Sequence, residues 1–85
     1  MRDFLVAGNW KMNTTIAEAE QLALAVVRSS ADIVDRQVMI APPFTALAEV
    51  ADILNDSEVS LASQNICWAE KGAFTGEISP PMLKD

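Results

Sequence analysis

Three short apolar runs alternate along the chain with two longer segments in which apolar residues recur at helical spacing. The runs cover residues 4–7, 38–41 and 59–62. The first two are nearly continuous, which is typical of parallel strands covered on both faces, whereas Ser60 interrupts the third. We therefore predict three β-strands, the third less completely buried than the other two.

The two intervening segments have the period of amphipathic helices. The apolar stripe of the first is formed by Ala19, Leu22, Ala23, Val26 and Val27. Thr15 and Glu18 have the spacing of a capping box, in which each side chain accepts a hydrogen bond from the other residue's backbone N–H. The stripe of the second is formed by Leu47, Val50, Ala51 and Leu54, and Asn55-Asp56 is expected to end that helix.

The resulting order β-α-β-α-β predicts an α/β fold with a parallel sheet and right-handed crossovers. Ser79 followed by Pro80 has the composition of a further helix start, with only residues 81–85 after it. No linker or low-complexity segment divides the chain. With 51% hydrophobic residues, residues 1–85 are expected to form a single domain with a packed core.

The charge and the cysteine content indicate which classes of binding partner and which cellular compartment are expected. Twelve acidic and six basic residues give a net charge of −6, which disfavours nucleic acid and anionic membrane surfaces. The single cysteine, Cys67, cannot form an intrachain disulfide. The apolar run that follows the charged residues 1–3 is too short for a signal peptide or a membrane span, so we expect a cytoplasmic protein.

Ligands of parallel α/β proteins bind at the carboxyl ends of the strands, here in loops 8–13, 42–45 and 64–79. Lys11 is the strongest candidate, because a cation at this edge can bind a phosphate or polarise a carbonyl oxygen. Asn9 is expected to point to the same side and to hold Lys11 or a substrate oxygen. On composition alone, a solvated lysine beside a turn-forming asparagine is the commoner arrangement. No spacing of Cys, Asp and Glu indicates a metal site.

Three segments, one after each predicted strand, form distinctive motifs. The first is Asn9-Trp10-Lys11-Met12-Asn13, and the second is Ala41-Pro42-Pro43-Phe44-Thr45. The third begins at Gln64-Asn65-Ile66-Cys67 and runs through Lys71-Gly72-Ala73-Phe74-Thr75-Gly76-Glu77-Ile78-Ser79. In order and spacing, these segments resemble triosephosphate isomerase. The resemblance covers essentially the whole chain and implies the first three β/α units of a TIM (β/α)8 barrel.

The resemblance implies an enzyme that interconverts dihydroxyacetone phosphate and glyceraldehyde 3-phosphate without metal or organic cofactor. Lys11 matches the active-site lysine that offsets substrate charge, and Asn9 matches the asparagine that helps to place it. Gln64 resembles a position that supports this lysine.

The resemblance further implies a homodimer. Thr75 and Gly76 match the tip of a loop that inserts into the partner subunit, near that subunit's loop of residues 9–12. Phe74, Glu77 and Met12 are the other residues expected at this interface.

The family's catalytic base is a glutamate of a later loop, and its electrophile is a neutral histidine after the fourth strand. The 85 residues contain no histidine. We therefore expect a partial barrel domain, cut at the start of its third helix, with no turnover on its own. Three alternatives remain: a self-associating chain that exchanges an element or opens into a three-layer, Rossmann-like sheet; one piece of a split isomerase; and a non-catalytic module that binds an anion at Lys11.

Overall fold

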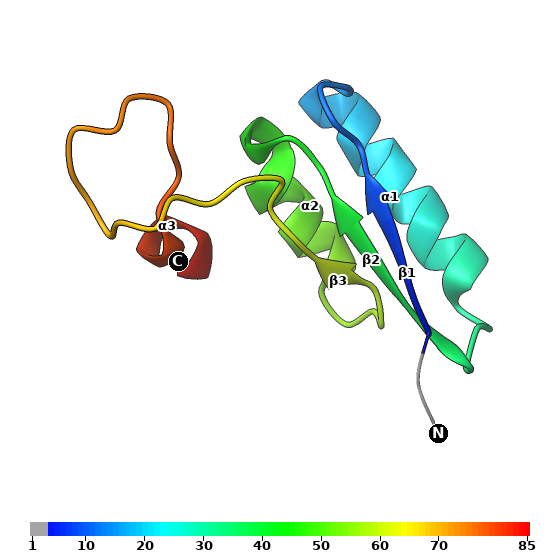
Figure 1. Cartoon of the computed structure of the whole chain (residues 1–85). Helices are drawn as coiled ribbons and strands as arrows, with labels where there is room; N and C mark the ends of the chain where they lie inside the picture. Colours follow the sequence, from blue (N-terminus) through cyan, green and yellow to red (C-terminus); the bar gives the residue numbers. More distant parts are fainter. Residues whose placement is uncertain (1–3) are drawn as a thin grey trace.

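The computed structural model describes residues 4–85, so the charged residues 1–3 considered above lie outside the described part of the chain. Along the chain (Figure 1) follow β1 (Phe4–Asn9), α1 (Ile16–Ser30), β2 (Arg36–Ala41), the 3-10 helix η1 (Phe44–Ala46), α2 (Leu47–Leu54), β3 (Ser60–Leu61) and α3 (Pro80–Lys84). The predicted strands and helices are all present. The third strand keeps only two residues.

The strands form one parallel sheet in the order β1-β2-β3. Val6 pairs with Val38, and Met39 pairs with Ser60. The predicted α/β class and parallel sheet are confirmed. The sheet is open and does not close into a barrel.

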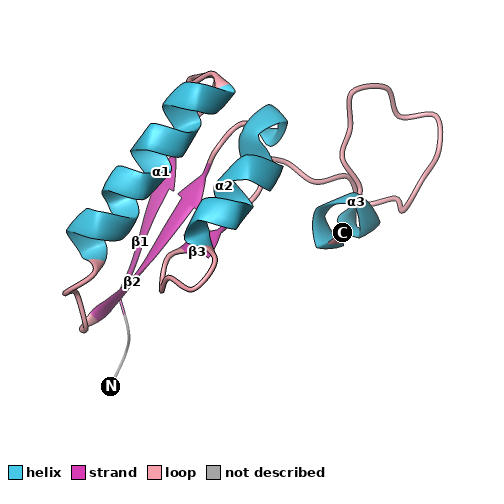
Figure 2. Ribbon diagram, turned by 180° about the vertical axis from the view of Figure 1, so that it is seen from behind, coloured by secondary structure: helices cyan, strands magenta, loops and turns pink. Residues whose placement is uncertain are grey.

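Both long helices cover the same face of the sheet (Figures 1 and 2). The buried core lies between them and the strands and consists of Ala19, Ala23, Ile40, Ala46, Val50, Leu54 and Val59. Because successive strand residues alternate, Leu5 and Met39 lie on the opposite face. Leu5 is 55% exposed. The strands are therefore covered on one face by residues 4–85, and the expectation of cover on both faces is wrong for this part of the chain.

Helix α1 begins with the predicted capping box. The Glu18 N–H donates to Thr15 Oγ1 at 3.3 Å, and the Thr15 N–H donates to Glu18 Oε1 at 2.8 Å. Ala19 and Ala23 are fully buried on the side of α1 that contacts α2. Leu22 was expected in the same stripe but is 42% exposed.

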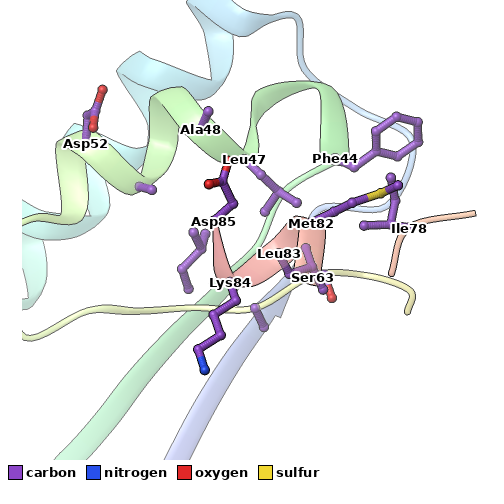
Figure 3. Close-up of a pocket in the computed structure, with 13 residues that line it drawn as sticks. Phe44, Leu47, Ala48, Asp52, Ser63, Ile78, Met82, Leu83, Lys84 and Asp85 are labelled. Atoms are coloured by element: carbon purple, nitrogen blue, oxygen red, sulfur yellow. The ribbon is translucent and has the colours of Figure 1, made fainter. Parts of the chain in front are cut away.

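Helix α2 ends at Leu54, and the N–H of Asn55 donates to the Ala51 carbonyl at 3.1 Å, as the predicted stop requires. An apolar groove of about 760 Å³ separates this helix from α3 (Figure 3). Leu47 of α2 and Met82 of α3 face each other across it. Neither Asn9 nor Lys11 lines this groove, so it lies apart from the candidate chemistry.

No helix within residues 4–85 is long and apolar enough to cross a membrane.

Candidate functional site

The loops after all three strands are joined by one side chain. Gln64, which follows β3, donates its Nε2 amide to the Lys11 carbonyl and to the Ala41 carbonyl, both at 2.9 Å. The Trp10 N–H also donates to Ala41, at 3.0 Å. Lys11 is therefore tied to the carboxyl ends of β2 and β3, where the sequence predicts a binding site.

The backbone of Lys11 has a φ of +55°. An L-residue in this left-handed region is destabilised by about 1–2 kcal/mol. The Lys11 N–H donates to Asn9 Oδ1 at 2.9 Å, while Gln64 binds the carbonyl of the same residue. Each such bond contributes about 0.5–1.5 kcal/mol net, so the two together offset the strain. Asn9 thus holds the backbone of Lys11, as its position two residues earlier suggests.

The ammonium group of Lys11 is free to meet a ligand. Lys11 is exposed, and within residues 4–85 it forms no ion pair. The ion pair found in that range joins Arg36 and Asp35 at 3.2 Å, at the opposite end of β2. Hydrogen bonding and then Coulomb attraction from Arg36 lower the pKa of Asp35. This exposed pair joins two neighbouring residues at the start of β2 and lies away from the candidate site.

Two residues of the first loop were not predicted as site residues. Asn13 donates its Nδ2 amide to the Trp10 carbonyl at 2.7 Å. Thr14 has a φ of +80°, an outlier for a β-branched residue, and its buried Oγ1 has no hydrogen-bond partner among residues 4–85. The sequence clue to this bond was Asn13 itself, because asparagine side chains often form hydrogen bonds with nearby backbone groups in turns.

The segment 64–79 forms a closed loop that projects away from the sheet (Figure 1). Asn65 donates its side-chain amide to Glu77 Oε2 at 2.8 Å, and the Cys67 N–H donates to the Ile78 carbonyl at 2.7 Å. These bonds close the neck of the loop. Beyond them, the rings of Trp68 and Phe74 pack edge to face with centroids 5.8 Å apart.

The residues predicted at a subunit interface are exposed on two loops. Phe74, Thr75, Gly76 and Glu77 lie on the projecting loop, and Met12, which is 95% exposed, lies on the loop after β1. Gly76 has a φ of +83°, which glycine adopts without strain. The carboxylate of Glu77 is engaged at the neck, so its structural role within the chain is to hold the loop closed. Their interface role stays a prediction.

No group of three or more acidic or cysteine side chains within residues 4–85 is placed to hold a metal ion. The described site itself consists of one cation on a fixed backbone, flanked by amide side chains.

Parallel β/α units with a lysine at the carboxyl end of the first strand define an α/β protein whose candidate binding site lies at that edge of an open sheet. The crystal structure of triosephosphate isomerase from Bartonella henselae matches it with a TM-score of 0.79 and 36% sequence identity, over 98% of this chain and 34% of that one. The family model for triosephosphate isomerase matches residues 4–85. The chain belongs to the triosephosphate isomerase family.

Curated relatives agree with this assignment. The triosephosphate isomerase of Synechococcus sp. is 51% identical over 100% of this chain and 35% of its own length. That of Chloroflexus aurantiacus is 48% identical over 100% of this chain and 34% of its own length. The chain thus spans about a third of the length of the relatives it matches.

Proposed function

We propose that this chain supplies the first third of a triosephosphate isomerase and, with it, the lysine that binds the triose phosphate. The observation that carries the proposal is the placement of Lys11. Its strained backbone is held by Asn9 and Gln64 at the carboxyl edge of the sheet, and its ammonium is left exposed.

Lys11 would act by electrostatics. An ammonium group is a compact positive charge that stabilises a phosphate and the negative charge that develops on a substrate oxygen as an enediolate forms. Holding the backbone in advance lowers the reorganisation required when substrate binds. The substrates are dihydroxyacetone phosphate and glyceraldehyde 3-phosphate, and the proposed setting is the cytoplasm.

A polypeptide of these 85 residues alone is expected to lack turnover. It contains no histidine, and the family's base belongs to a later loop. A single acid–base group is typically responsible for about 10²–10⁴-fold in rate, so losing both groups removes most of the acceleration. We propose that residues 1–85 form one partial barrel domain and that the other strands complete the site.

Complementation tests this proposal. The chain is mixed with a second polypeptide that carries the remaining two thirds of the Synechococcus relative, and isomerase turnover is measured on glyceraldehyde 3-phosphate. We expect turnover from the mixture, its loss with Lys11→Ala, and its retention with Lys71→Ala as the matched control. A stable complex of the two polypeptides that is inactive would contradict the proposed complementation. A complex that is equally active with Lys11→Ala would contradict the proposed role of Lys11.

We further propose that the chain self-associates when it is alone. Phe4, Leu5 and Val6 of β1 are 69%, 55% and 49% exposed, and β1 is an edge strand. An uncovered apolar edge strand favours pairing with another chain. Solution mass from analytical ultracentrifugation should show a defined homo-oligomer. A soluble monomer without cooperative unfolding would contradict self-association, and the chain would then be a piece that needs the remaining strands for order.

The projecting loop gives the association a specific test. If Thr75 inserts into a partner subunit, Thr75→Arg should reduce the oligomer to smaller species, because a cation would be buried in the contact. Thr45→Arg, on the loop after β2, is the control. An unchanged mass for Thr75→Arg would exclude this loop from the interface.

A further inference from the structure

We propose that Asn13 is a positioning residue for Lys11, because its side-chain amide fixes the peptide group that precedes the lysine. The inference rests on the proposed role of Lys11 as the anion-binding group. It adds a third amide side chain to the two, Asn9 and Gln64, already expected to support that lysine.

Asn13 and Asn9 hold opposite ends of one rigid unit. The Trp10 carbonyl and the Lys11 N–H belong to the same planar peptide group. Asn13 donates to that carbonyl at 2.7 Å, and Asn9 accepts from that N–H at 2.9 Å. With both ends bonded, the plane of the peptide before the Lys11 Cα is fixed, and this plane determines φ of Lys11.

Gln64 fixes the peptide on the other side. Its Nε2 lies 2.9 Å from the carbonyl oxygen of Lys11, which belongs to the peptide after the Cα. The orientation of that peptide determines ψ. The three amides together therefore set both torsions of a residue whose φ of +55° is unfavourable for a side chain with a Cβ.

Asn13 is the member of this set that follows Lys11 in the turn. The turn is tied to the sheet at one side, where the Trp10 N–H bonds to Ala41 at 3.0 Å, and to α1 at the other, where Thr15 caps the helix. Within residues 4–85, Asn9 accepts from the Lys11 N–H on the strand side of the turn, and Asn13 donates to the Trp10 carbonyl from the helix side. Without the bond from Asn13, we expect Lys11 to relax toward negative φ, which redirects its Cα–Cβ bond and moves the ammonium.

Nuclear magnetic resonance of the isotope-labelled chain tests the proposal with two readouts at Lys11. The one-bond coupling between the α carbon of Lys11 and its proton is smaller at positive φ and so reports the sign of φ, and the Lys11 shifts during titration with inorganic phosphate report anion binding. We expect Asn13→Ala to change the coupling and to weaken phosphate binding by about threefold to tenfold, as the loss of one hydrogen bond implies. Gln21→Ala, an exposed amide of α1, should leave both readouts unchanged.

The outcomes separate the two proposals. An unchanged coupling and unchanged phosphate affinity in Asn13→Ala would overturn the role of Asn13. A parent chain whose Lys11 does not respond to phosphate would count against the proposed function, while the coupling would still decide on Asn13. If Asn13→Ala unfolds the chain, Asn13→Asp serves instead, because aspartate has the same shape and no donor. A parent-like coupling in Asn13→Asp would equally contradict the proposal.

Discussion

The side-chain amide of Gln64 lies 2.9 Å from the carbonyl oxygen of Lys11, across 53 positions of sequence. The same amide nitrogen also binds the Ala41 carbonyl at 2.9 Å. One side chain thus links the ends of all three strands. It makes the conformation of the lysine depend on the formation of the sheet.

Gln64→Ala should therefore release the loop after β1. Two hydrogen bonds to backbone carbonyls disappear, but both lie at an exposed site where water can replace them. We expect the free energy of unfolding to fall by about 1 kcal/mol in urea denaturation. Gln37→Ala, an exposed amide of β2, is the control. A loss no larger than that of the control would show that Gln64 does not stabilise the loop.

Thr14→Gly should stabilise the protein, although it deletes a side chain. Thr14 has a φ of +80°, and glycine adopts this conformation without a Cβ clash. Relief of strain outweighs the added freedom of the unfolded chain, so the free energy of unfolding should rise by about 1 kcal/mol. Thermal and urea unfolding measure the change. Thr45→Gly, in η1, should destabilise, and a loss of stability in Thr14→Gly would contradict the strain at this position.

The capping box predicts a pH dependence. Hydrogen bonds from the backbone and then the side chain of Thr15 lower the pKa of Glu18 below its ordinary value of 4.5. Because the pKa of Glu18 is lower in the folded chain than in the unfolded chain, the ionised carboxylate stabilises the folded state at pH values above its unfolded-state pKa. This stabilisation is lost as the pH falls through the folded-state pKa.

The difference in unfolding free energy between the parent and Glu18→Gln should thus shrink from about pH 6 to about pH 3. Glu20→Gln, on the same helix, serves as the control. A difference that stays constant over this range would mean that the ionised carboxylate does not cap α1.

The neck of the projecting loop can be tested by proteolysis. Glu77→Ala removes the acceptor that Asn65 binds at 2.8 Å, so the loop should open more often. Trypsin should then cleave after Lys71, on the same loop, several-fold faster than in the parent, as followed by mass spectrometry. Glu58→Ala, which precedes β3, should leave the rate unchanged. Equal rates in all three chains would show that the neck bond does not restrain the loop.

Local signals in the sequence predicted most of the fold. The capping box of Thr15 and Glu18, the stop at Asn55 and the three apolar runs depend on neighbouring residues, and each is found in the structure. The apolar runs indicate strands buried on both faces, but they do not reveal whether the second covering layer is supplied by the same residues. Leu5 is a strand residue that remains exposed for this reason.

The candidate site was predicted less completely. Because Lys11 follows an apolar strand directly, the sequence predicts that it lies at the carboxyl edge of the sheet. Its positive φ and the converging amides depend on contacts between segments far apart in sequence, such as that of Gln64. The bond from Asn13 to Trp10 is local, yet an asparagine in a turn has several possible acceptors. Torsions of this kind follow from the assembled structure and not from residue patterns.

The most direct test of the central claim is isomerase turnover by the purified 85-residue chain on glyceraldehyde 3-phosphate, with Lys11→Ala measured beside it. We predict no turnover in either chain, because the lysine is present without a general base and an electrophile. Turnover in the parent that is lost in Lys11→Ala would contradict the account, since a complete site would then have assembled from these residues alone.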